Sequence, residues 1–309
     1  RRRRRQREMR QTDQKGADHG ADVSLEHDYL HWFEAVYRST VCKPYEPCHS
    51  IQIIDGVVRV TLKCSSLHHI LVFGMIEFIT ITSQFNGPPG SGHGGYVAGA
   101  FADLVDGPAE VTLRSPPPLD RTMTVSHEGE SARVYDGGTL VGEVRPSELS
   151  LDIPDCPKPD AVAGAEIRFN EFKKDDFHNC FACGAGREEG DGLRLLTGPV
   201  EGSDVVAAHW TPHANFASED GLILPRILWS ALDCPGVWSI IRDSGIIMLL
   251  GRLTARVDPD LAVGTRCTVI GWPIERAGRK ALAGTALYDD TGKIRGMAKA
   301  VWIDIGKRV

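Results

Sequence analysis

The strongest constraint on the fold of this chain is an order of elements that its sequence repeats. After residue 74, a β-branched and apolar segment leads through a loop to an apolar helix, and four short strand-like segments follow. The same order returns after residue 174. One apolar helix beside about five antiparallel strands is an α+β arrangement. The repeat therefore predicts an α+β fold with two domains, in each of which an antiparallel sheet wraps around a central helix.

In the first copy, glycine and alanine residues mark the helix, which we expect over residues 93–105. Such small side chains allow neighbouring backbones to approach closely. A Gly/Pro-rich loop at 85–92 precedes this helix, and Gly-containing turns separate the strands that follow it. Strands are expected at 75–84, 109–114, 121–127, 131–136 and 139–144.

The second copy has a longer apolar helix, which we expect over residues 222–241 after a polar loop at 211–220. A turn at 289–292 separates the last two strands. Strands are expected at 192–196, 204–210, 246–257, 266–272, 279–288 and 294–305.

The two copies define the domain boundaries that we expect. The first domain covers residues 75–150 and the second covers residues 175–309. Prolines punctuate the segment 151–174, which is typical of a linker. Residues 1–74 precede both domains as an N-terminal extension.

The extension mixes charge, histidine and scattered aromatic residues without a sustained period, which is typical of a largely disordered or loosely packed segment. Two of its parts have local signals. Residues 25–37 could form one amphipathic helix. Asp55-Gly56 stands between two apolar runs and predicts a β-hairpin over residues 51–64.

Charge is unevenly distributed along the chain. Residues 1–10 hold seven arginines and one glutamate, so the other 299 residues carry a net charge of −12, against −6 for the whole chain. Nucleic-acid binding needs a basic face that neutralises phosphates. The arginine run is most simply a solvated tail. We therefore expect no nucleic-acid partner.

Membrane insertion is not expected either. The longest apolar run, at 70–81, is interrupted by Gly74 and Glu77 and is shorter than the roughly 20 residues that a bilayer requires. No apolar segment with a cleavage site follows the arginine cluster, so no signal peptide is expected. Eight cysteines in 309 residues are too few for a secreted disulfide scaffold. These observations predict a cytoplasmic protein with reduced thiols.

Three segments resemble a known family. FNGPPGSGHGGYVAGAF at 85–101 resembles the start of the central helix in hotdog-fold proteins, in particular the PaaI-like acyl-CoA thioesterases. HNCFACG at 178–184, with GLRL at 192–195, looks like the opening of hotdog domains, and WSALDCPG at 229–236 looks like a helix segment of related thioesterase-like proteins. The resemblance covers residues 75–305 and implies a double hotdog.

The resemblance implies a thioester site at the first helix. The backbone N–H groups of Gly94 and Gly95, which lack partners in a first helical turn, could polarise a thioester carbonyl and stabilise the oxyanion. His93 and Asn86 would help to orient the substrate. The alternatives are that His93 only caps the helix and that Asn86 is a turn residue.

Two carboxylates are candidates for the base or nucleophile. The family carries an aspartate nine positions after the histidine of His-Gly-Gly, where this chain has Ala102, and Asp103 follows one position later. One step along a helix rotates a side chain by about 100°. Asp233 lies in the second helix among apolar neighbours, where a carboxylate is costly without a role. The alternative for Asp233 is a structural role near Pro235, where the helix could break.

The start of the second helix lacks the His-Gly-Gly motif. Asp220 and Gly221 stand there instead, and we expect them near the substrate. Because the body is acidic, coenzyme A phosphates would need local cations, and we expect Arg226 to supply one, together with Arg252 and Arg256.

A metal and a cofactor are not expected. A structural zinc site needs four ligands, usually from two Cys pairs, and this chain has one Cys-x-x-Cys, at Cys180 and Cys183. Only His178, Cys156 and the distant Cys234 remain, so the two cysteines are interpreted as small side chains in a turn. No glycine-rich segment has the spacing of a P-loop or a dinucleotide site.

The leading hypothesis is a thioesterase-like hydrolase that cleaves an acyl-CoA to free acid and coenzyme A. Two hotdog halves would form a pseudo-dimer, and two such chains could form a homodimer. Two alternatives stay open on the same fold: a non-catalytic acyl-CoA-binding protein, and a hydratase or dehydratase of acyl thioesters.

Overall fold

The structure, a computed structural model, describes residues 48–54, 57–63, 77–172, 177–242 and 244–307. Strands β1 (Cys48–Ile54) and β2 (Val57–Lys63) form a sheet of their own, which confirms the strands of the predicted hairpin. The turn at Asp55-Gly56, the helix expected at 25–37 and the arginine run lie outside the described residues.

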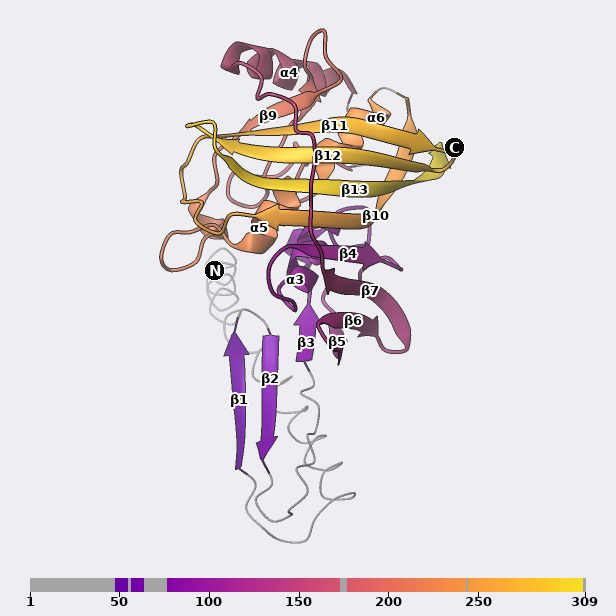
Figure 1. Cartoon of the computed structure of the whole chain (residues 1–309), viewed down its shortest axis with the longest axis vertical. Helices are drawn as coiled ribbons and strands as arrows, with labels where there is room; N and C mark the ends of the chain where they lie inside the picture. The colour runs from indigo at the N-terminus through magenta and orange to yellow at the C-terminus, as the bar shows by residue number, and fades with distance from the viewer. Residues whose placement is uncertain (1–47, 55–56, 64–76, 173–176, 243, 308–309) are drawn as a thin grey trace, which may run out of the picture. The chain divides into compact units, whose positions relative to one another are not determined.

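Eleven strands form one antiparallel sheet, in the order β3-β5-β6-β7-β4-β10-β13-β12-β11-β9-β8 (Figure 1). β4 pairs with β10 and joins the two halves, with Val111 opposite Leu253. The first half holds β3 (Glu77–Thr80), β4 (Ala109–Leu113), β5 (Thr122–Glu128), β6 (Ser131–Asp136) and β7 (Thr139–Pro146). The second holds β8 (Gly198–Pro199), β9 (Val206–Trp210), β10 (Ile246–Val257), β11 (Cys267–Ala277), β12 (Lys280–Asp289) and β13 (Ile294–Lys307).

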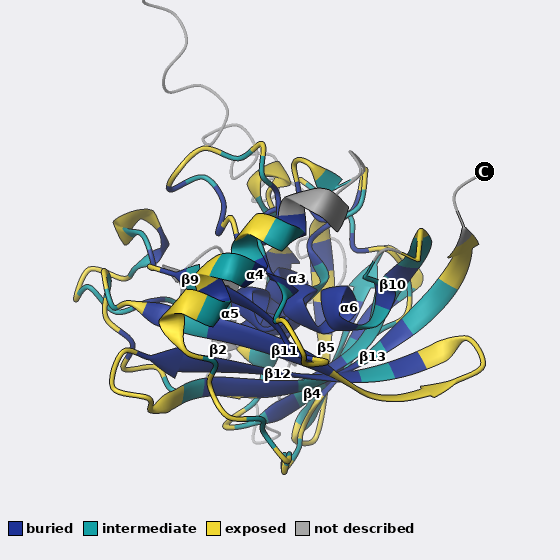
Figure 2. Ribbon diagram, turned by 90° about the horizontal axis from the view of Figure 1, so that it is seen from above, coloured by how far each residue is buried: buried dark blue, intermediate teal, exposed yellow. Residues whose placement is uncertain are grey.

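Three mostly buried helices lie against this sheet: α3 (Gly94–Ala102) in the first half, and α5 (Pro225–Ala231) and α6 (Cys234–Ile241) in the second (Figure 2). A short 3-10 helix precedes each group, at Ser83–Phe85 and at Ala214–Phe216. Apolar side chains from the helices and the sheet share one core, in which Phe101 and Leu228 are fully buried. The helix expected at 93–105 is thus confirmed, and no described helix has the length and apolarity to cross a bilayer.

Two predicted elements differ from the structure. The helix expected over 222–241 is two helices, because the chain breaks at Asp233 just before Pro235, which cannot donate a backbone hydrogen bond. The strand expected at 192–196 is absent. Its backbone instead binds a neighbouring loop, since the N–H groups of Leu193 and Leu195 donate to the carbonyls of Phe181 and Ala182.

The segment expected to be a linker contains a helix, α4 (Pro159–Phe172). It packs against β8 and β9, and its Val162 and Phe169 are buried. Pro159 is compatible with this helix because the first turn has no intrahelical acceptor for the N–H that proline lacks.

Candidate functional site

The two halves meet where α3 touches α5. The helices run antiparallel and are separated only by glycines of α3. A Cβ atom at Gly95 would lie 2.5 Å from the Cβ of Asp233 and 2.8 Å from the carbonyl oxygen of Trp229. One turn later, a Cβ atom at Gly99 would lie 2.6 Å from the Cα of Arg226. Glycine at these two positions therefore brings the N-terminus of α3 against the end of α5.

Asp233 lies at this contact and is 3% exposed. Its Oδ2 accepts a hydrogen bond from the Gly95 N–H at 2.6 Å and lies 3.2 Å from Nε2 of His93. Its Oδ1 is buried and has no hydrogen-bond partner among the described residues. Burial raises the pKa of Asp233 to about 6, although His93 and the Gly95 N–H act in the opposite direction.

His93 caps α3 and is 2% exposed. Its Nδ1 accepts from the Tyr96 N–H at 3.2 Å, so the neutral ring carries its proton on Nε2. Nε2 faces the Oδ2 of Asp233 at 3.2 Å and the Sγ of Cys234 at 3.3 Å. Burial by itself would lower the pKa of His93, but the charges of Asp233 and Cys180 outweigh it and raise the pKa.

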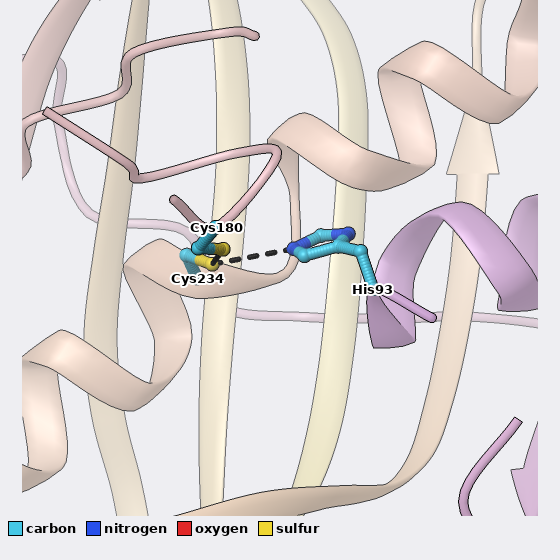
Figure 3. A group of neighbouring side chains, drawn as sticks. All are labelled: His93, Cys180 and Cys234. Atoms are coloured by element: carbon cyan, nitrogen blue, oxygen red, sulfur yellow. Dashed lines mark hydrogen bonds between the residues drawn. The ribbon is translucent and has the colours of Figure 1, made fainter. Parts of the chain in front are cut away.

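Two buried cysteines, Cys180 and Cys234, lie beside the imidazole, and the buried Cys183 follows in the same loop as Cys180. Cys180 and Cys183 come from the loop before β8, and Cys234 begins α6 (Figure 3 shows His93, Cys180 and Cys234). The sulfur atoms of Cys180 and Cys234 are 3.9 Å apart. Hydrogen bonds from Cys183 and Cys234 hold the pKa of Cys180 well below its usual range, and the same contacts raise the pKa of Cys234.

Gly94 is the partly exposed residue between buried His93 and buried Gly95, so it lies where this contact comes nearest to the surface in the first turn of α3. No acceptor within the described part of the chain binds the Gly94 N–H. A Cβ atom at Gly94 would lie 2.8 Å from the side chain of Leu250 and 3.2 Å from Oδ2 of Asp233. The N–H of Gly94 is therefore available to a ligand, next to the carboxylate.

The opposite end of α3 holds the other candidate acid. Asp103 caps the C-terminus of α3, about 14 Å along the helix from Gly94, and pairs with Arg226 at 3.1 Å. Arg226 follows Pro225, which is the first residue of α5 as Gly94 is the first residue of α3. Proline has no backbone N–H, so α5 lacks the donor that Gly94 provides in α3. Asp103 thus lies away from Asp233, and the guanidinium expected to bind phosphate is engaged by a carboxylate.

The remaining predicted residues lie outside the contact between Asp233 and Gly95. Exposed Asp220 and partly exposed Gly221 form a turn before α5, in which Asp220 accepts from the Ser218 hydroxyl and the Gly221 carbonyl accepts from the Val263 N–H. Asn86 precedes α3 and accepts a hydrogen bond from Arg187. The structure therefore brings together Asp233, His93, Gly94 and Gly95, and it places Asn86, Asp103, Asp220, Gly221 and Arg226 elsewhere.

From the sequence alone, Cys180, Cys183 and Cys234 are considered as ligands but His93 is not, and the Cys-x-x-Cys pair is interpreted as turn residues because no second pair follows at similar spacing. Cys234 is 54 residues from Cys180 and 141 residues from His93. One sequence signal pointed to Asp233, namely its distance from the residue that corresponds to His93. The backbone N–H of His93 donates to the Phe85 carbonyl, and that of Leu224 donates to the Phe216 carbonyl, so His93 and Leu224 occupy equivalent positions. Asp233 stands nine residues after Leu224, which is the spacing that the family resemblance implies.

Comparison with known proteins gives structural similarity alone. No protein-family model matches the chain, and no curated protein matches it. A putative thioesterase from Novosphingobium aromaticivorans is 18% identical, with a TM-score of 0.48 over 74% of this chain and 94% of its own. The acyl-CoA thioesterase II TesB2 from Mycobacterium marinum is 12% identical, with a TM-score of 0.46 over 75% and 93%. The PaaI protein from E. coli is 11% identical, with a TM-score of 0.31 over 34% and 75%.

The fold follows from the topology of the chain itself. Each half holds antiparallel strands beside a buried helical segment, and the halves join edge to edge through β4 and β10. The two helical segments pack against each other at the centre. The predicted α+β class is confirmed, because each half places antiparallel strands beside a buried helical segment.

Proposed function

We propose that this chain hydrolyses an acyl thioester of coenzyme A at the N-terminus of α3, with Asp233 as the base. The observation that carries the proposal is the environment of the Asp233 carboxylate. One oxygen accepts from the Gly95 N–H at 2.6 Å, and the other is buried without a partner. A buried carboxylate oxygen without a hydrogen bond destabilises a fold. The unpartnered oxygen therefore favours a catalytic role for Asp233 over a purely structural role.

The positions of these groups support a direct hydrolysis. The thioester carbonyl would accept a hydrogen bond from the Gly94 N–H, where the α3 dipole also stabilises negative charge. The Oδ1 of Asp233 would remove a proton from water, and the water oxygen would add to the carbonyl carbon. The carbon–sulfur bond then breaks. The proton on Asp233 passes to the departing sulfur, which gives the free acid and the coenzyme A thiol.

His93 would act as a positioning residue in this reaction. Its Nδ1 accepts from Tyr96 in the first turn of α3, and its Nε2 faces Asp233. The ring therefore orients the carboxylate and the helix N-terminus together. Leu250, which lies over Gly94 and is partly exposed, marks the side from which the acyl thioester would approach.

The test is release of free thiol from acyl-CoAs of increasing chain length by the full chain and by Asp233→Asn. Loss of a general base lowers the rate by about 10²–10⁴-fold. Asp103→Asn is the matched control, because Asp103 is the other candidate acid and lies at the opposite end of α3. We expect this control to retain the rate of the unmodified chain.

Two outcomes would contradict the proposal directly, and two more would favour an alternative function. One is a folded chain that releases thiol from no acyl-CoA, and another is Asp233→Asn with an unchanged rate. Hydration of crotonyl-CoA without thiol release would favour the hydratase. Thermal stabilisation by acyl-CoA without any turnover would favour a binding protein.

A further inference from the structure

Three thiols and one imidazole converge beside Asp233 from segments that are far apart in the chain. His93 begins α3, Cys180 comes from the loop before β8, and Cys234 begins α6 (Figure 3). Cys183 comes from the same loop as Cys180. The nitrogen of His93 and the sulfur atoms of Cys180 and Cys234 all lie within 4.8 Å of one another. All four side chains are buried, and the three cysteines are free of disulfides.

Cys183 lies next to this group of three and is the candidate for a fourth ligand. It is buried three residues after Cys180, and it affects the pKa of both Cys180 and Cys234, so its thiol lies close to theirs. The turn that aims Cys180 and Cys183 inward is closed by the Gly184 N–H, which donates to the Cys180 carbonyl at 2.8 Å. A Cβ atom at Gly184 would lie 2.3 Å from that carbonyl oxygen, so the turn requires glycine. A tight turn around a Cys-x-x-Cys pair is a common half of a zinc site.

Two of the distances between the proposed ligand atoms are close to those of a tetrahedral zinc site. Zinc bonds to cysteine sulfur at about 2.3 Å and to histidine nitrogen at about 2.0–2.1 Å. The edges of such a tetrahedron measure about 3.8 Å between two sulfurs and about 3.6 Å between sulfur and nitrogen. The structure has 3.9 Å between Cys180 and Cys234, and 3.3 Å between Cys234 and His93.

We propose that His93, Cys180, Cys183 and Cys234 bind one Zn²⁺ in a closed, structural site. Four protein ligands leave no open position on the ion, so the ion would not carry out the hydrolysis. Each thiol loses its proton on binding, and the His93 proton moves from Nε2 to Nδ1. Zinc on Nε2 then replaces the contact of that atom with Asp233, which keeps its hydrogen bond from the Gly95 N–H, and the hydrogen bond from Tyr96 to Nδ1 is lost. At 3.2 Å the bond from Tyr96 is a long neutral bond, which is weak beside four bonds to zinc.

The ion would fasten the first half to the second. His93 belongs to the first half and the three cysteines belong to the second. Asp233 directly precedes Cys234, and Gly94 directly follows His93. Zinc would therefore hold the carboxylate against the start of α3. This consequence rests on the proposed hydrolysis, whereas zinc binding itself does not.

The test is the zinc content of the purified full chain, measured by mass spectrometry of the metal after expression with added zinc. We expect about one zinc per chain. X-ray absorption at the zinc edge should report about three sulfur ligands and one nitrogen ligand. Cys180→Ser, Cys183→Ser and Cys234→Ser should each lose zinc. Cys156→Ser is the matched control, because this exposed cysteine lies outside the group, and it should retain zinc.

A second measurement does not depend on the folding of these variants. After removal of zinc from the unmodified chain by a chelator, titration with Co²⁺ should produce thiolate-to-metal absorption that saturates near one equivalent. A chain that binds neither Zn²⁺ nor Co²⁺ would overturn the proposal. So would a disulfide between Cys180 and Cys234 in the freshly purified protein, or full zinc content in the three serine variants. Retained zinc without thioester hydrolysis would refute only the proposed function.

Discussion

Replacement of Gly95 by alanine tests the contact on which the site depends. The new methyl group would lie 2.5 Å from the Cβ of Asp233 and 2.8 Å from the Trp229 carbonyl oxygen. Carbon atoms in contact are normally about 3.5–4.0 Å apart, so α3 and α5 would have to separate by about 1 Å. Overpacking of this kind destabilises a protein by about 1–3 kcal/mol. Helix propensity offsets at most about 1 kcal/mol of this, because alanine is a better helix former than glycine.

The assay is the free energy of unfolding from urea denaturation, for Gly95→Ala and for a matched Gly164→Ala. Gly164 lies in α4, where a Cβ atom meets only the Arg168 side chain, at 3.5 Å. That control should be more stable than the unmodified chain by up to about 1 kcal/mol. If the proposed function holds, Gly95→Ala should also lose about 10²-fold in rate, because Asp233 moves by about 1 Å. Equal stability of Gly95→Ala and Gly164→Ala would refute the close contact.

Three more changes test the fold. Burial would raise the pKa of Asp289, but hydrogen bonds from Thr291 and Arg295 outweigh it and lower the pKa to about 2. Because the pKa in the folded chain lies below the usual 3.8, this carboxylate stabilises the fold by about 2 kcal/mol above pH 4. In urea denaturation at pH 7, Asp289→Asn should therefore have a free energy of unfolding lower by that amount. The difference from the unmodified chain should shrink as the pH falls toward 2. Leu253→Ala at the fully buried seam of β10 should lower the free energy of unfolding by about 2–5 kcal/mol. Arg187→Ala removes a charged donor to the Gln84 carbonyl at 2.7 Å, and a loss of about 1.5–3 kcal/mol in the same assay is expected.

Local signals account for the parts of the fold that the sequence predicted. The turns of the two β-hairpins in the first half contain Gly129 and Gly137, which adopt positive φ angles of 64° and 57°. Such turns favour glycine, so their positions are readable without knowledge of the fold. The helix at Gly94–Ala102 is likewise marked by its own small residues. By contrast, α4 was missed because Pro159 was interpreted as part of a linker and not as a helix start.

The site depends on contacts between distant residues, which local patterns do not specify. Asp233 and Gly95 are 138 residues apart, and their contact exists only because β4 pairs with β10 and α3 packs on α5. The apolar residues at 192–196 have the composition of a strand. They form a loop because their backbone partners are Phe181 and Ala182, in the turn that carries two cysteines. Composition cannot distinguish these two ways of burying an apolar segment.

The two ends of α3 explain why a duplicated fold would carry only one site. Each end places the helix N-terminus of one half against the end of the helix of the other half. If His93 and Leu224 are equivalent, Asp233 has Ala102 as its counterpart, and Gly94 has Pro225. The second end therefore lacks both the buried acid and the first N–H of the helix. Under the proposed function, the first half supplies the helix start and the second half supplies the acid, so neither half would be functional without the other half of the same chain.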